Sequence, residues 1–190
     1  VPEKNTGYDV GVEIPFNAGK GSLDITYFHE TLEDKIGFPD PESFVPEQIK
    51  GESDRQGLEM AAQIMLSKRL DLMVNYTYID ATNPEGDIEI RRPRNELGIQ
   101  GIWRLPNNMT TLAGNVRYVR GLFDNENWKD NFPTKRLSSF AVANLSASQK
   151  LMDGVELTAR ITNLFDENYR EVLGYATRGR AAFIGLRASF

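Results

Sequence analysis

The chain has 190 residues, enough for one large domain or two small ones. Its 27 acidic and 22 basic residues give a net charge of −5, whereas nucleic-acid-binding domains usually carry a basic excess. Nucleic acid is therefore not an expected partner. The sequence contains no cysteine and one histidine, which excludes disulfide frameworks, thiolate metal sites and histidine-rich metal centres within it. We predict no metal site and no cofactor.

Apolar and polar residues alternate along most of the chain, and a period of two residues predicts half-buried β-strands. The segment 60–66 has helical propensity on its own, but both of its neighbours alternate, so we predict strand there too. The serine- and alanine-rich segment 136–150 alternates less cleanly, with Leu145 and Ala147 on its apolar face. We predict nine strands, at residues 8–14, 23–28, 58–67, 71–78, 96–104, 111–118, 136–150, 155–162 and 181–190.

The connections between these strands are alternately short and long. Short ones lie near residues 16–21, 68–70, 105–108 and 151–154 and carry turn-forming Asn, Asp, Pro and Gly. Long ones span roughly 33–50, 83–92, 123–135 and 164–178. In an antiparallel up-and-down sheet, this order places every short turn at one edge and every long loop at the other. Outer-membrane β-barrels have this arrangement, which the Greek-key connections of a soluble sandwich would not enforce.

Alternation alone does not say whether the apolar face points into a soluble core or out to lipid. Bulky charges in the middles of strands favour a solvated lumen, and aromatic residues near strand ends favour an interfacial girdle. The last strand also ends on an aromatic residue, Phe190. These features predict an antiparallel transmembrane β-barrel, with a soluble β-binding module as an alternative. The girdle candidates are Tyr8, Tyr78, Trp103 and Tyr118.

Four sequence motifs, in order along the chain, resemble those of TonB-dependent outer-membrane transporters. Residues 2–13 (PEKNTGYDVGVE) resemble the family's PEKSxxYExG strand, and residues 23–36 resemble its TYFxxxxxDxI hairpin. Residues 91–95 (RRPRN) are similar to RRPRH, with Asn95 where the family often has histidine. Residues 163–169 (NLFDENY) resemble the NLFDxxY signature near the family's C-terminus, and the strand that ends at Phe190 resembles its assembly signal.

The resemblance implies a 22-stranded barrel with a plugged lumen. Residues 1–190 would then be one domain, the C-terminal portion of that barrel, without the plug, the TonB-contacting box and the N-terminal strands. An odd number of strands cannot close a purely antiparallel ring, and unpaired strand edges are costly in lipid. We therefore expect either a longer polypeptide or a partner that supplies the missing edge.

The function implied by the resemblance is energy-coupled uptake of a large scarce nutrient, an iron–siderophore or cobalamin, across the bacterial outer membrane. The implied partners are TonB–ExbB–ExbD acting through the missing plug, outer-membrane lipid and lipopolysaccharide, and the barrel assembly machinery. A passive porin-like or structural barrel without energy coupling is the alternative. We predict no enzyme activity, because the one histidine, His29, has no nucleophile and third partner arranged beside it in the sequence.

Three sets of residues follow as functional candidates. Aromatic residues of the long loops are candidates for ligand capture, against the simpler interpretation that they pack within the loops: Phe44, Phe123, Trp128, Tyr169 and Tyr175. Polar-face residues expected to point into the lumen and hydrogen-bond the plug are Glu59, Glu96, Arg117 and Arg160. Residues of the assembly signal are Ile184, Leu186, Ala188 and Phe190.

One basic cluster, Arg91, Arg92 and Arg94, has two interpretations. Its guanidinium groups could contact an anionic ligand or a lipid phosphate. Because the cluster belongs to the strand-entry motif, a structural role is at least as well supported.

Overall fold

The structure is a computed structural model that describes residues 2–37, 45–125 and 133–189. Phe44, Trp128 and Phe190, three of the predicted site residues, lie outside the described residues.

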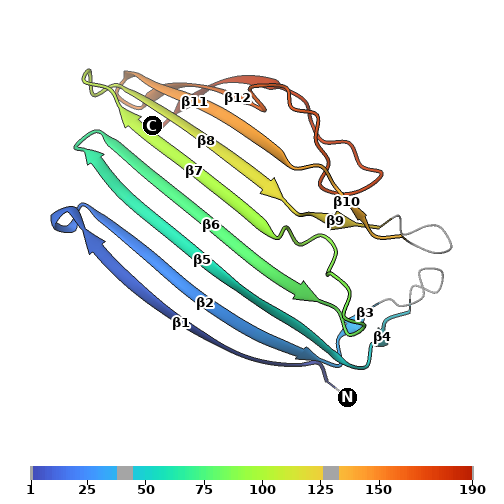
Figure 1. The fold of residues 1–190 in the computed structure, drawn as a ribbon. Coiled ribbons are helices and arrows are strands. Elements are labelled where there is room, and N and C mark those ends of the chain that lie inside the picture. The colour runs from blue at the N-terminus through green and yellow to red at the C-terminus, as the bar shows by residue number, and fades with distance from the viewer. Residues whose placement is uncertain (1, 38–44, 126–132, 190) are drawn as a thin grey trace.

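Nine strands form one antiparallel sheet, which confirms the predicted fold class (Figure 1). Each strand pairs with the one that precedes it in the sheet order, with no crossover. The 60–66 segment lies within a strand, so the alternation of its neighbours predicted it better than helical propensity did. In sheet order, the strands are β1 (Lys4–Phe16), β2 (Gly21–Glu33), β5 (Glu52–Ser67), β6 (Leu70–Thr82), β7 (Asn95–Arg104), β8 (Thr110–Arg120), β11 (Phe140–Met152), β12 (Val155–Thr162) and β13 (Ala181–Ala188).

Short turns and long loops separate to opposite ends of the sheet, as the sequence predicted (Figure 1). The turn between β1 and β2 contains a short 3-10 segment, η1 (Asn17–Gly19), in which Asn17 and Ala18 have positive φ. Two of the long loops contain small hairpins that the sequence did not predict. These are β3 (Ile36–Gly37) with β4 (Glu47–Gln48), and β9 (Phe123–Asp124) with β10 (Lys135–Arg136).

The predicted strand 136–150 begins four residues late, because its first residues belong to a hairpin. Arg136 pairs with Phe123, and the Leu137 amide donates to the Leu122 carbonyl. The strand that joins the main sheet, β11, therefore starts at Phe140. Leu145 and Ala147 lie on the apolar face, as predicted, where they pair with Gly114 and Leu112.

The sheet has a polar face and an apolar face that are continuous across all nine strands. Directly paired residues share a face, and the row Thr26, Glu59, Thr77 and Glu96 runs across four strands on the polar side. Ile102 and Phe183, which interrupt the alternation in the sequence, also lie on the polar face: Ile102 pairs with Asp71 and Phe183 with Arg160.

The apolar face carries large exposed side chains. Val10, Trp103 and Ile184 are 65%, 47% and 79% exposed. A monomeric soluble protein rarely exposes so extensive an apolar surface. Within the described residues, no helix is both long enough and apolar enough to cross a membrane.

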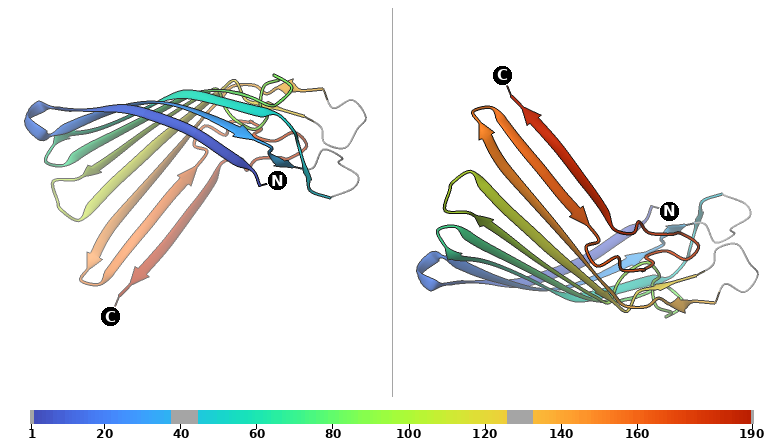
Figure 2. Two further views of the ribbon diagram at one scale, coloured as in Figure 1. Left: turned by 90° about the horizontal axis from the view of Figure 1, so that it is seen from below. Right: turned by 90° about the horizontal axis from the view of Figure 1, so that it is seen from above.

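The sheet curls across its strands, and the segment from Leu164 to Arg180 lies within the curl (Figure 2). That segment contacts the polar face through Glu171 and Tyr169, so the polar face is the concave one. The hydrophobic core is correspondingly small and sits at the long-loop end of the sheet. Its buried members are Val119, Leu122, Leu137 and Phe140, with Val142, Tyr169 and Leu173 packed against them.

Candidate functional site on the polar face and the long loops

The four predicted lumen residues all lie on the concave polar face, but only two of them meet. Arg117 Nε donates to Glu96 Oε1 at 2.7 Å, and its Nη1 lies 3.1 Å from Oε1 of Glu171 in the last long loop. This pairing holds the loop against β8. Glu96 and Arg117 are therefore already satisfied by neighbours within this chain.

Glu59 and Arg160 lie apart from that pair. Arg160 places its guanidinium carbon 4.4 Å from the centre of the Phe183 ring, which is cation–π geometry. Among the described residues, neither Glu59 nor Arg160 has an ion-pair partner. These two side chains remain available to a group that enters the concave side of the sheet.

The described loop aromatics differ in their accessibility. Tyr169 stacks on Phe140 with ring centres 4.4 Å apart, and its carbonyl accepts a hydrogen bond from Thr177. Phe123 is half-buried in β9. Tyr175 is 67% exposed. Of these predicted ligand residues, Tyr175 is thus the one whose ring is free to contact a ligand, whereas the Tyr169 ring packs against Phe140 of β11.

A buried carboxylate that the sequence analysis missed joins two long loops to β9. Asp124 has no exposed surface, and its Oδ1 accepts hydrogen bonds from Arg91 Nε at 2.9 Å and from the Asn125 amide at 2.9 Å. Its Oδ2 accepts one from the Leu173 amide at 2.7 Å. One side chain therefore fixes the 83–94 and 163–180 connections relative to each other.

A second missed carboxylate, Glu89, is the centre of an ion network at the same end of the sheet. It is 6% exposed and binds Lys35, Arg55 and Arg92, while Arg55 also reaches Glu30 at 2.9 Å. Burial disfavours the charged carboxylate, but the hydrogen bonds from Arg55 and Lys35 outweigh it and lower the pKa of Glu89 to about 2. The network joins β2, β5 and two long connections.

The basic cluster is structural in this chain, because each of its arginines has a carboxylate partner. Arg91 binds Asp124, Arg92 binds Glu89, and Arg94 Nη2 lies 2.6 Å from Asp80 Oδ1. Glu89 precedes Arg91 by two residues and Arg92 by three, and this spacing is the signal that could have identified it.

The NLFDENY motif forms a compact turn. The Asn163 side chain donates to the carbonyls of Glu167 and Arg178 and accepts from the Glu167 amide at 2.8 Å. The residue is 3% exposed and has a φ of 49°, a left-handed conformation that asparagine tolerates. Asp166 adds a hydrogen bond from the Arg180 amide. The motif thus closes the base of the long loop that returns to β13.

The predicted assembly-signal residues that the structure describes lie on β13. Ile184, Leu186 and Ala188 share the apolar face, where Ile184 and Leu186 are exposed. In the parts of the chain that the structure describes, no group of three His, Cys, Asp or Glu side chains is arranged to hold a metal ion.

A family described as TonB dependent receptor-like, beta-barrel, matches residues 1–164. The chain belongs to this family. TonB-dependent receptors of this type are outer-membrane transport proteins and not enzymes, in agreement with the sequence-based predictions of location and class.

A curated relative resembles most of this chain. The metal-pseudopaline receptor CntO of Pseudomonas aeruginosa is 25% identical over 179 residues, which cover 90% of this chain and 25% of that protein. The chain therefore spans about a quarter of the length of this curated relative.

Two solved structures share the fold. The ferripyoverdine receptor of P. aeruginosa, bound to ferripyoverdine, superposes with a TM-score of 0.80 at 15% identity, over all of this chain and 27% of that one. The ferric enterobactin receptor PfeA of the same organism gives 0.78 at 21% identity, over 99% of this chain and 31% of that one.

Proposed function

We propose that residues 1–190 are the C-terminal portion of the barrel of a TonB-dependent transporter that imports a metal chelate of the siderophore or metallophore class. The observation that carries the proposal is the match to a metal-pseudopaline receptor along 90% of this chain. The plug and the remaining strands of the barrel would belong to the rest of the polypeptide.

The geometry supports a binding mechanism rather than a chemical one. The long loops are fixed to one another through Asp124 and Glu89, so they form a preorganised rim at one end of the sheet. Preorganisation lowers the ordering cost of binding a large ligand. Tyr175, exposed on that rim, would contact the apolar part of the chelate.

The concave face would hold the plug. Glu59 and Arg160 have opposite charges and lie on separate strands, so they would take hydrogen bonds and ion pairs from the plug surface. Movement of the plug by TonB–ExbB–ExbD would then open the lumen. Groups that are partly exposed and weakly paired suit this role, because the contacts must form and break in each transport cycle.

The test uses the full-length receptor in its native outer membrane. Three labelled compounds are compared as transported substrates, in cells with and without TonB. They are ferripyoverdine carrying radioactive iron, a metal–pseudopaline complex and cobalamin. We expect saturable uptake of one metal chelate that is lost without TonB. Uptake of cobalamin alone would reject the proposed ligand class, and uptake that needs no TonB would identify a passive barrel.

A further inference from the structure

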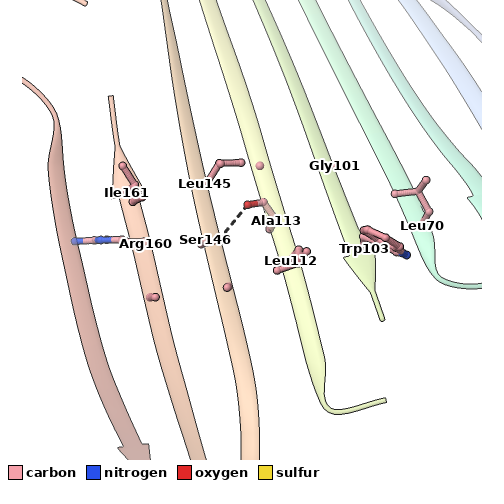
Figure 3. A pocket seen from close by; sticks show the side chains of 12 residues that line it. Leu70, Gly101, Trp103, Leu112, Ala113, Leu145, Ser146, Arg160 and Ile161 are labelled. Carbon is pink, nitrogen blue, oxygen red and sulfur yellow. Dashed lines mark hydrogen bonds between the residues drawn. The ribbon is translucent and has the colours of Figure 1, made fainter. Parts of the chain in front are cut away.

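The apolar face contains a groove of about 430 Å³ near the short-turn end of the sheet (Figure 3). Its walls are formed by Leu70, Trp103 and Leu112 on one side and by Leu145 and Ile161 on the other. Leu70 opens β6, and Trp103 is the next-to-last residue of β7, which places this groove close to the turns.

The floor of the groove is made by residues without bulky side chains. Gly101 and Gly114 pair directly across β7 and β8 on the apolar face. The Leu145 side chain reaches over Gly114, where an added Cβ would lie 2.9 Å from Cδ2 of Leu145. A Cβ added at Gly101 would meet no atom within 4 Å, so the space above this residue is open. A larger residue there would fill the groove without disturbing the strands.

The location of the groove indicates its occupant. The apolar face points to lipid in an outer-membrane barrel, and short turns lie on the periplasmic side. The groove is therefore at the depth of the inner leaflet, which consists of phospholipid. Trp103, which is 47% exposed in the wall of the groove, has the amphipathic ring that is typical of the membrane interface.

Two basic residues lie at the turn next to the groove. Lys68 and Arg69 directly precede Leu70, and the side chains of both lack ion-pair partners among the described residues. By contrast, Arg104 at the end of β7 is paired with Asp71 at 2.6 Å. Basic groups at the membrane surface bind the phosphates of lipid head groups.

We propose that this groove is a phospholipid site: an acyl chain lies over Gly101 between the two walls, and Lys68 and Arg69 bind the headgroup phosphate. The site is independent of the transported ligand. It requires that the apolar face be the lipid-facing one and that the short turns lie on the periplasmic side.

The test titrates the purified full-length receptor in mild detergent with phosphatidylglycerol and follows bound lipid by native mass spectrometry. The variant is Gly101→Val. Valine is chosen because its β-branched side chain favours strand conformation. The control is Gly98→Val, on the same strand but on the polar face, where an added Cβ also meets no atom within 4 Å. Resistance of the folded barrel to unfolding in detergent at room temperature confirms that both variants fold.

We expect one saturable lipid on the wild type and on Gly98→Val, and an affinity about tenfold lower on Gly101→Val. A double variant, Lys68→Gln with Arg69→Gln, should also weaken binding of phosphatidylglycerol but leave binding of uncharged diacylglycerol unchanged. Equal lipid binding by the wild type and Gly101→Val would overturn the proposal. A receptor dimer that forms without lipid and is lost in Gly101→Val would also overturn it, by identifying a second copy as the occupant.

Discussion

Arg91 and Asp124, 33 residues apart in sequence, form a hydrogen-bonded ion pair in which the carboxylate is fully buried and the guanidinium is about half exposed. Because Asp124 also accepts a hydrogen bond from the Leu173 amide, this one pair connects two long loops and β9. The rim of the sheet is thus fixed by polar contacts, in a chain whose apolar core is small.

Asp124→Ala should release that rim. It leaves the Leu173 amide and Arg91 without their acceptor, and losses of this kind cost about 2–4 kcal/mol. We expect the 83–94 and 163–180 connections to become sensitive to limited proteolysis while the strands stay protected. Asp153→Ala is the control, because Asp153 is fully exposed and pairs only with Lys150. Equal protease resistance of both variants would contradict the anchoring role.

The ion network at Glu89 predicts a specific pH dependence. The pKa of Glu89 falls from 4.5 in an unfolded chain to about 2 in the fold, so its stabilising contribution is complete above pH 4.5 and is lost as the pH falls towards 2. Glu89→Gln should cost about 2–3 kcal/mol at pH 7 and remove this part of the acid sensitivity. Urea unfolding in detergent at several pH values measures both effects.

The control for this network is Glu33→Gln, which breaks the exposed pair with Lys4. Exposed pairs contribute between zero and about 1 kcal/mol, so this change should have little effect at any pH. An acid sensitivity in Glu89→Gln equal to that of the wild type would show that other carboxylates control it.

Asn163→Ala should loosen the turn formed by the NLFDENY motif. It removes the contacts to Glu167 and Arg178 and places alanine at a positive φ, which together should cost about 2–3 kcal/mol. Hydrogen exchange of the amides between residues 164 and 180 would report the loss. Asn168→Ala, at an exposed position in the same motif, should exchange like the wild type; similar exchange in both variants would argue against the turn role of Asn163.

Substitutions of the two loop tyrosines should affect different properties, ligand binding at Tyr175 and stability at Tyr169. Tyr175→Ala removes an exposed ring and should weaken chelate binding about tenfold with no change in unfolding. Tyr169→Ala removes a ring stacked on Phe140 and should destabilise the loop instead. Isothermal titration with the transported chelate and thermal unfolding of each variant test this; unchanged binding in Tyr175→Ala would remove this residue from the ligand site.

The strand order and both faces of the sheet were predictable, because alternation is a local property that each strand displays separately. Even the exceptions are explained by packing: Phe183 breaks the alternation because its ring lies under Arg160 on the polar face. The anchors of the long loops were not predictable in the same way. Asp124 obtains Arg91 and the Leu173 amide from segments distant in sequence, and no local pattern reveals such pairing. The same holds for the contacts of Glu89 with Lys35 and Arg55, whereas its pairing with Arg92 is local.

The hairpin β9–β10 was also not predictable from a local pattern in the sequence. The strand predicted at residues 136–150 was expected to lie in one sheet, yet Arg136, together with Lys135, pairs with β9 and not with the main sheet. Their assignment depends on where the preceding loop returns. Likewise, Arg117 lies on the polar face, but no local pattern indicated that Glu96 and Glu171 would bind it.

Spin labels can determine which face of the sheet meets lipid. Residues 1–190 contain no cysteine, so once any cysteine elsewhere in the receptor is replaced, single cysteines can carry a spin label in place of Glu59 or Met60, adjacent residues of β5 on opposite faces. In the full-length receptor in lipid vesicles, we predict that the label at Met60 is relaxed by oxygen dissolved in the bilayer and not by a water-soluble nickel chelate. The label at Glu59, on the face proposed to hold the plug, should be shielded from the oxygen in the bilayer. A label at Met60 shielded from oxygen, or exposed to the nickel chelate, would contradict the membrane barrel.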